Sequence, residues 1–162
     1  MSHTSTIESI RFMDIDAVEM AVNELREKHG VRLRFERNLK PRAYYPDQEG
    51  MTEPAPYCIV VEDAKYDIGL YPAADGQGYE ARYDTFDYPV EAGIRHYIGA
   101  EVEQQDSAEL GYSANDQAAA GKLYNLYSIH ATMRRAFALG YSDVQRVETP
   151  DGRTQVHVGL AA

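Results

Sequence analysis

The segment of residues 31–45 carries side chains that could bind an anion. Its basic residues are Arg32, Arg34, Arg37, Lys40 and Arg42, against the single acidic residue Glu36, and the tyrosines Tyr44 and Tyr45 follow. Arginine side chains bind phosphate through paired hydrogen bonds, and a tyrosine ring can stack on a base. We therefore expect a small phosphate-bearing ligand, such as a nucleotide, to contact Arg32, Arg34, Arg42 and Tyr44. The alternative is that these charges protect an edge strand from aggregation, with the arginines paired to the acidic middle of the chain, residues 46–121.

Two histidines and an aspartate could carry acid–base chemistry. His3 and His130 supply imidazoles, the side chains that most often act as general acids and bases, and Asp67 could assist either of them. A hydrolase using these three residues is one hypothesis. The alternative is that His3 locks the first strand and that His130 is a core residue on a helix. Tyr127, one helical turn before His130, is a further candidate ligand-binding residue.

Metal and cofactor sites are not expected. None of the five histidines has a partner at the spacing that would put two ligands on one helical face. The chain has one cysteine, Cys58, which excludes a disulfide scaffold and lies in a predicted buried strand. The sequence Gly76-Gln77-Gly78 falls in a predicted hairpin turn and does not open a helix, so it lacks the context of a dinucleotide-binding loop.

The charge of the chain is unevenly distributed. The net charge is -10, but residues 1–45 carry +1, residues 46–121 carry -13 and residues 122–162 carry +2. An acidic surface repels phosphate backbones, so binding to duplex nucleic acid is not expected. No apolar run approaches the roughly 20 residues that a membrane span needs, and no signal peptide is visible. These features favour a protein of the cytoplasm that does not bind membranes.

Hydrophobic periodicity predicts the elements that would position these residues. A strand over 6–12 and a helix over 14–29 are followed by a half-buried strand from Val31. A buried strand over 57–61 and a hairpin of 65–71 with 79–83 come next. Two helices are expected over 90–103 and 117–139, the second with an apolar stripe that includes Tyr127, His130 and Phe137. A last hairpin joins 144–148 to 154–160.

These elements predict one α+β domain over residues 1–162, an antiparallel sheet covered on one face by two or three helices. A ferredoxin-like or split β-α-β arrangement fits their order. Four of the seven prolines fall in residues 41–56, which we expect to form a loop. Residues 89–121 have the character of an acidic insertion.

Several short stretches, in their order and spacing, resemble the ycf-thirty-five-like family, domain of unknown function twelve fifty-seven. They are Met1-Ser2-His3, Asp67-Ile68-Gly69, Tyr127-x-x-His130 before Gly140-Tyr141, and Asp151-Gly152. Members of that family occur in plastids, cyanobacteria, other bacteria and phages. The resemblance covers about two-thirds of the chain and implies a fold but no reaction. Residues 41–56 and 89–121 look longer than in a minimal member.

Three functions follow as hypotheses. The first is a non-enzymatic binding or regulatory protein that contacts a protein partner or a second copy of itself. The phage members of the family make an action on host proteins one form of this hypothesis. The second is a binder of a small anion or nucleotide through residues 31–45. The third is the hydrolase using His3 and His130.

Overall fold

The structure, a computed structural model, describes residues 4–43, 51–62, 65–84, 121–151 and 154–159. Its strands are β1 (Thr4–Phe12), β2 (Leu33–Leu39), β3 (Ala55–Val61), β4 (Ile68–Pro72), β5 (Tyr79–Asp84), β6 (Asp143–Glu148) and β7 (Thr154–Gly159). The helices are α1 (Ile15–His29) and α4 (Gly121–Ala138). The predicted helix over 90–103, and all but the last residue of the acidic insertion 89–121, lie outside the described residues.

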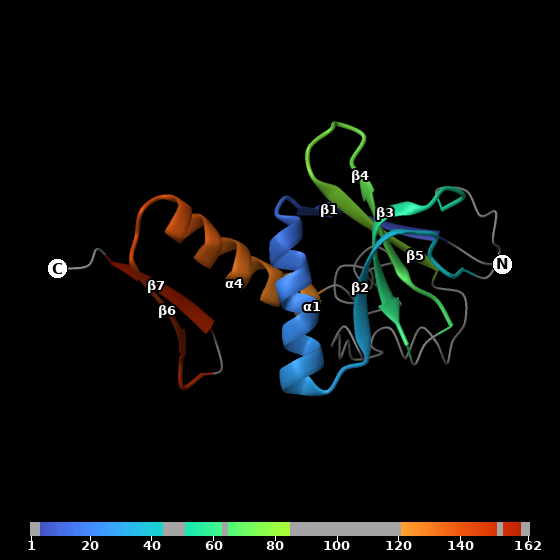
Figure 1. Cartoon of the computed structure of the whole chain (residues 1–162). Helices are drawn as coiled ribbons and strands as arrows, with labels where there is room; N and C mark the ends of the chain where they lie inside the picture. Colours follow the sequence, from blue (N-terminus) through green and yellow to red (C-terminus); the bar gives the residue numbers. More distant parts are fainter. Residues whose placement is uncertain (1–3, 44–50, 63–64, 85–120, 152–153, 160–162) are drawn as a thin grey trace, which may run out of the picture.

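Five strands form one antiparallel sheet in the order β1-β5-β4-β3-β2 (Figure 1). Each neighbouring pair is antiparallel, so the edge strands β1 and β2 run in the same direction. Helix α1 connects these two edge strands, and β5, β4 and β3 lie between them. This is a split β-α-β arrangement, and it confirms the predicted α+β class.

Helix α1 begins and ends where its sequence predicts. The Asp14 carboxylate accepts a hydrogen bond from the Ala17 N–H and caps the N-terminus. Gly30 adopts the left-handed conformation (φ 66°), and its N–H donates to the Leu25 carbonyl. The buried face contains the four residues that the helical period predicts, namely Val18, Ala21, Val22 and Leu25.

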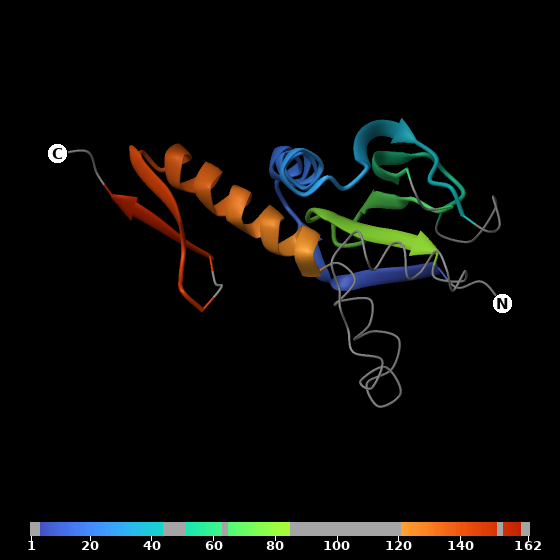
Figure 2. The ribbon, with the colours of Figure 1, turned by 90° about the horizontal axis from the view of Figure 1, so that it is seen from below.

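The first turns of α4 pack against α1 and against the end of β1. Leu123, Leu126 and Tyr127 are buried there, as the apolar stripe predicts. Phe137 does not continue this stripe, because its side chain is 54% exposed. Figure 2 shows the reason: α4 runs away from the sheet and passes beyond α1, so its last turns lie outside the main core. The sequence prediction for Phe137 is therefore wrong.

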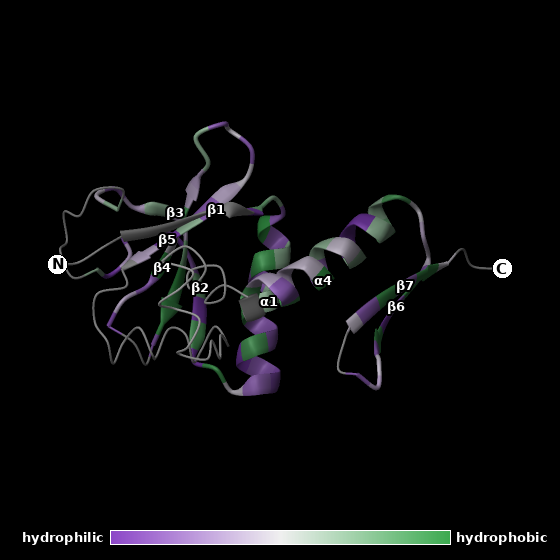
Figure 3. Ribbon diagram, turned by 180° about the vertical axis from the view of Figure 1, so that it is seen from behind, coloured by the Kyte–Doolittle hydropathy of each residue, from purple (hydrophilic) through white to green (hydrophobic). Residues whose placement is uncertain are grey.

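Strands β6 and β7 form a separate antiparallel pair at the far end of α4. Val144 is opposite Val158 and Arg146 is opposite Val156, so these four residues share one face. Val156 packs against the main core, but Val158 is 47% exposed. Figure 3 shows this hairpin, with hydrophobic and hydrophilic residues mixed, apart from the five-stranded sheet.

The five-stranded sheet buries side chains on both faces. Alternate residues of the β4–β5 hairpin lie under the helices, as predicted, namely Ile68, Leu70, Ala81 and Tyr83. The opposite face holds a smaller cluster, formed by Met51, Ala55, Cys58, Val60 and Tyr71 with Ala43 beside it. Parts of the Pro-rich segment 41–56 therefore cover this second face. Gly69 permits this close packing, since a Cβ there would lie 2.7 Å from the Pro41 ring.

Candidate functional site

A groove of about 510 Å³ lies on the face of the sheet opposite the helices. Its lining residues are Arg32, Arg34, Leu39, Lys40, Arg42, Val60, Glu62 and Asp67. Four of these side chains are basic and two are acidic. The structure thus brings together the three arginines Arg32, Arg34 and Arg42 that the sequence proposed as ligand-binding residues. Tyr44, the fourth residue proposed there, lies outside the described residues.

Strand pairing places the groove residues. Arg34 is opposite Val60, and the Glu62 N–H donates to the Arg32 carbonyl over 3.0 Å. The two-residue period of a strand then puts Arg32 and Arg34 on one face. Asn38 interrupts this period with a φ of 52°, in the left-handed region. After Asn38 the side chain of Leu39 lines the groove, although strict alternation would turn it toward the helices.

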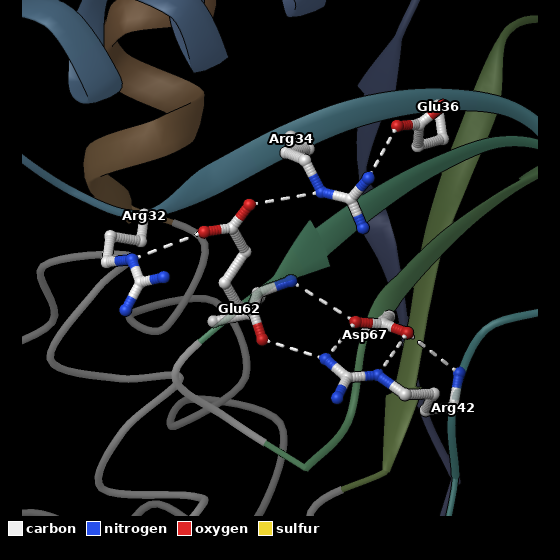
Figure 4. A network of polar contacts seen from close by, with 7 residues as sticks. Arg32, Arg34, Glu36, Arg42, Glu62 and Asp67 are labelled. Atoms are coloured by element: carbon white, nitrogen blue, oxygen red, sulfur yellow. Dashed lines mark hydrogen bonds and ion pairs between the residues drawn. The ribbon is translucent and has the colours of Figure 1, made fainter.

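The Glu62 carboxylate lies between two of the groove arginines (Figure 4). One of its oxygens is 3.2 Å from Nε of Arg32, and the other is 3.1 Å from Nε of Arg34. Arg34 also donates from Nη1 to Glu36 over 3.0 Å. The Arg32 and Arg34 side chains are 65% and 45% exposed. The groove therefore presents positively charged groups to solvent while an internal carboxylate orients them.

Asp67 holds Arg42 in place at the same site. Its carboxylate is almost fully buried and accepts hydrogen bonds from Nε and Nη2 of Arg42 at 2.9 and 2.8 Å. It also accepts the backbone N–H groups of Arg42 and Val61 at 3.0 and 3.2 Å. The hydrogen bonds with Asp67 raise the pKa of the Arg42 guanidinium above its ordinary value. Asp67 is thus a positioning residue for Arg42.

Tyr127, proposed from the sequence as a ligand-binding residue, does not line this groove. Its hydroxyl accepts the backbone N–H groups of Met13 and Asp14 at 2.8 and 3.2 Å. Its ring packs edge-on against Phe12, with 5.0 Å between the centroids. The buried tyrosine therefore ties α4 to the turn before α1.

The structure does not bring the described hydrolase candidates together. Asp67 is engaged with Arg42 on the face opposite the helices, whereas His130 lies on α4 with Nε2 3.3 Å from the carboxylate of Glu24. Asp67 and His130 therefore lie on opposite sides of the five-stranded sheet. His3 lies outside the described residues. Among the residues that the structure describes, the hydrolase hypothesis gains no geometric support.

Glu24 is a buried carboxylate that sequence analysis did not single out. It contacts Nζ of Lys28 at 3.0 Å, Nη1 of Arg146 at 2.5 Å and the His130 imidazole. Burial opposes its ionisation, but the hydrogen bonds from Lys28 and Arg146 outweigh burial, and the pKa of Glu24 is lowered. The carboxylate thus joins α1 to α4 and to β6. Its position next to Leu25, beside the predicted apolar face of the helix, was the available signal.

Glu62 was also missed at the level of the sequence. The signal that would reveal it is the register between β2 and β3. Leu33 is opposite Val61, the last residue of β3, so Glu62, which follows β3, lies beside Arg32. The alternation of residues within one strand does not show which residues of a neighbouring strand lie opposite them, so sequence patterns alone could not place Glu62.

Cys58 has no features of a reactive thiol. It is fully buried, and burial raises its pKa to about 12. Within the described ranges, no three His, Cys, Asp or Glu side chains gather as a metal ion would require. Neither described helix is long and apolar enough to cross a membrane.

Comparison with known proteins finds no family model, no curated protein and no solved structure that matches this chain. The resemblance to the ycf-thirty-five-like family therefore stays a prediction.

Proposed function

We propose that this chain is a non-enzymatic binding protein whose groove takes a small anionic ligand. One observation supports this proposal above the others: four basic side chains line one groove, from β2 and the segments directly before and after it, namely Arg32, Arg34, Lys40 and Arg42. Guanidinium groups suit carboxylate and phosphate ligands because their N–H groups lie in a plane and can bind two oxygens together.

Protection of an edge strand accounts for only part of this arrangement. β2 is an edge strand, and charges along it would discourage pairing with another chain. Arg42, however, lies beyond the end of β2 and is fixed by the buried carboxylate of Asp67. A charge meant only to disrupt aggregation does not need such positioning. The placement of Arg42 therefore favours binding.

The groove walls indicate the character of the ligand. Small-molecule pockets commonly have volumes of about 300–1,000 Å³ and mostly apolar walls. This groove is of that size, but only Leu39 and Val60 supply apolar side chains. We therefore propose a compact, strongly charged ligand. Stacking of a nucleotide base on Tyr44 stays a prediction from the sequence.

Calorimetric titration with inorganic pyrophosphate at low salt tests this proposal. Arg34→Gln and Arg42→Gln should each weaken binding by about tenfold, as expected for one lost charge-assisted hydrogen-bond contact. Arg37→Gln is the matched control, because Arg37 lies on the same strand but pairs with Glu19 at 3.0 Å and does not line the groove. Absence of pyrophosphate binding to the wild-type chain would overturn the proposal. If Arg37→Gln weakens binding as much as Arg34→Gln and Arg42→Gln do, the proposal is also overturned, because binding would then depend only on the total positive charge.

A second candidate function, contact with a second copy of the chain, is favoured by a different observation. Exposed apolar side chains occur at the end of α4, directly after it and on β7, namely Phe137, Leu139, Tyr141 and Val158. Exposed apolar patches commonly mark interaction sites, and a two-stranded hairpin is marginally stable alone. Light scattering after gel filtration should show a dimer that Phe137→Ser and Leu139→Ser convert to monomer. A wild-type monomer at high micromolar concentration would contradict this candidate.

A further inference from the structure

Glu62 occupies the position in the groove where an oxyanion of a ligand would bind. Its two carboxylate oxygens are shared between Nε of Arg32 and Nε of Arg34 (Figure 4). We propose that Glu62 is an internal competitor, which a doubly charged phosphate group displaces when it binds. This inference rests on the proposed anion-binding function and adds the class of ligand and the way in which the groove selects it.

Glu62 is held much less firmly than the other groove carboxylate. Asp67 is 2% exposed and accepts two backbone N–H groups besides the Arg42 side chain. The Glu62 side chain is 29% exposed and, among the described residues, its carboxylate contacts only the Arg32 and Arg34 side chains. Ion pairs that stay partly exposed to water are worth little individually. The Glu62 carboxylate can therefore turn into solvent at small cost, whereas Asp67 cannot.

Displacement of a carboxylate favours ligands with more than one negative charge. A monocarboxylate that replaces Glu62 re-forms the same contacts with the same charge, so it gains little from the exchange. A phosphate monoester carries a charge nearer -2 at neutral pH and has three strong acceptor oxygens, and pyrophosphate, with two phosphate groups, carries more charge and more acceptors. Arg32 and Arg34 then interact with a larger charge than Glu62 supplies. The groove should consequently bind pyrophosphate and discriminate against acetate.

Removing the charge of Glu62 tests the displacement directly. In Glu62→Gln the competing charge is absent, so pyrophosphate should bind about fivefold more tightly, equivalent to about 1 kcal/mol for two exposed ion pairs. Glu19→Gln is the control: it makes the same change of net charge, but Glu19 pairs with Arg37 away from the groove. Its pyrophosphate affinity should equal that of the wild type. Thermal unfolding of both variants checks that each one folds.

The outcomes separate this inference from the proposed function. Tighter pyrophosphate binding by Glu62→Gln alone, with acetate at least about tenfold weaker than pyrophosphate, supports the displacement. Pyrophosphate binding that is unchanged or weaker in Glu62→Gln overturns the displacement and leaves the anion-binding function in place. If Glu62→Gln and Glu19→Gln gain the same affinity for pyrophosphate, the displacement is also overturned, because the change in net charge would explain both gains. Failure of the wild type and of Glu62→Gln to bind pyrophosphate overturns both proposals.

Discussion

Tyr127→Phe removes a single oxygen atom that joins α4 to the beginning of α1. The hydroxyl accepts two backbone N–H groups, from Met13 at 2.8 Å and from Asp14 at 3.2 Å. Asp14 is also the residue that caps α1, so both donors belong to the turn from which the helix starts. The phenylalanine ring keeps the edge-on contact with Phe12, so the substitution changes hydrogen bonding and leaves packing in place.

The expected loss of stability follows from the two donors. A buried donor that loses its partner costs about 1–3 kcal/mol. The two N–H groups lie in a partly buried turn, where water can reach one of them after the substitution. We therefore expect the free energy of unfolding to fall by about 2 kcal/mol. For a chain of this size, that loss lowers the melting temperature by roughly 4–8 °C.

Urea unfolding followed by circular dichroism measures this change, and Tyr124→Phe is its control. Tyr124 lies in the same aromatic group, 5.9 Å from Phe12 between ring centroids, and its hydroxyl makes no hydrogen bond to a described residue. Its substitution removes the same atom without freeing a donor, and should cost less than about 0.5 kcal/mol. If Tyr127→Phe and Tyr124→Phe lose the same stability, the structural role assigned to the Tyr127 hydroxyl is refuted.

Three further substitutions test the other buried contacts. Asp67→Asn removes the buried charge that Arg42 faces, so the free energy of unfolding in urea should fall by about 2–3 kcal/mol. Asp75→Asn, at an exposed turn residue, is the control. If both variants lose the same stability, the role of Asp67 in fixing Arg42 is contradicted. The pKa of Glu24 is lowered from 4.5, so its stabilisation is complete above that pH and is lost as the pH falls below it. Glu24→Gln should therefore flatten the acid side of the stability–pH curve, and an unaltered acid side would argue against the ion pairs. In Gly78→Ala the new Cβ would lie 3.0 Å from the Phe12 carbonyl, whereas in Gly76→Ala it meets no atom within 4 Å. Both glycines have positive φ, so thermal unfolding should show a greater loss for Gly78→Ala, and equal losses would mean that the carbonyl contact has no effect.

Local sequence patterns were sufficient for most elements of the fold. Asp14, the apolar period and Gly30 each lie within or beside α1, so they define that helix without reference to the rest of the chain. The same holds for the β4–β5 hairpin, whose turn residues and alternating apolar residues are close in sequence. The pairing of β1 with β5 could not be predicted in this way, because no pattern within either strand identifies a partner about 80 residues away.

Sequence analysis identified part of the groove, the side chains of Arg32, Arg34 and Arg42. The strand period placed Arg32 and Arg34 on one face, and Arg42 was identified from its charge. Glu62 and the positioning role of Asp67 depend on the register between β2, β3 and the segment that follows β2. Tyr127 was assigned to a ligand because the sequence does not show that α4 crosses the beginning of α1. Contacts between distant segments therefore account for what sequence analysis missed.

The strand order also has a consequence for the order of events during folding. Strands β2, β3, β4 and β5 pair with their neighbours in sequence, whereas Thr4 of β1 pairs with Asp84 of β5. Loop-closure entropy makes the neighbouring pairs quick to form and the β1–β5 pair slow. Among the strands of this sheet, β1 is synthesised first and is the last to pair, and until then the free edge of β5 stays open to other chains. Pulsed hydrogen exchange during refolding should show amides of β3 and β4 protected before those of β1, and simultaneous protection would contradict this order.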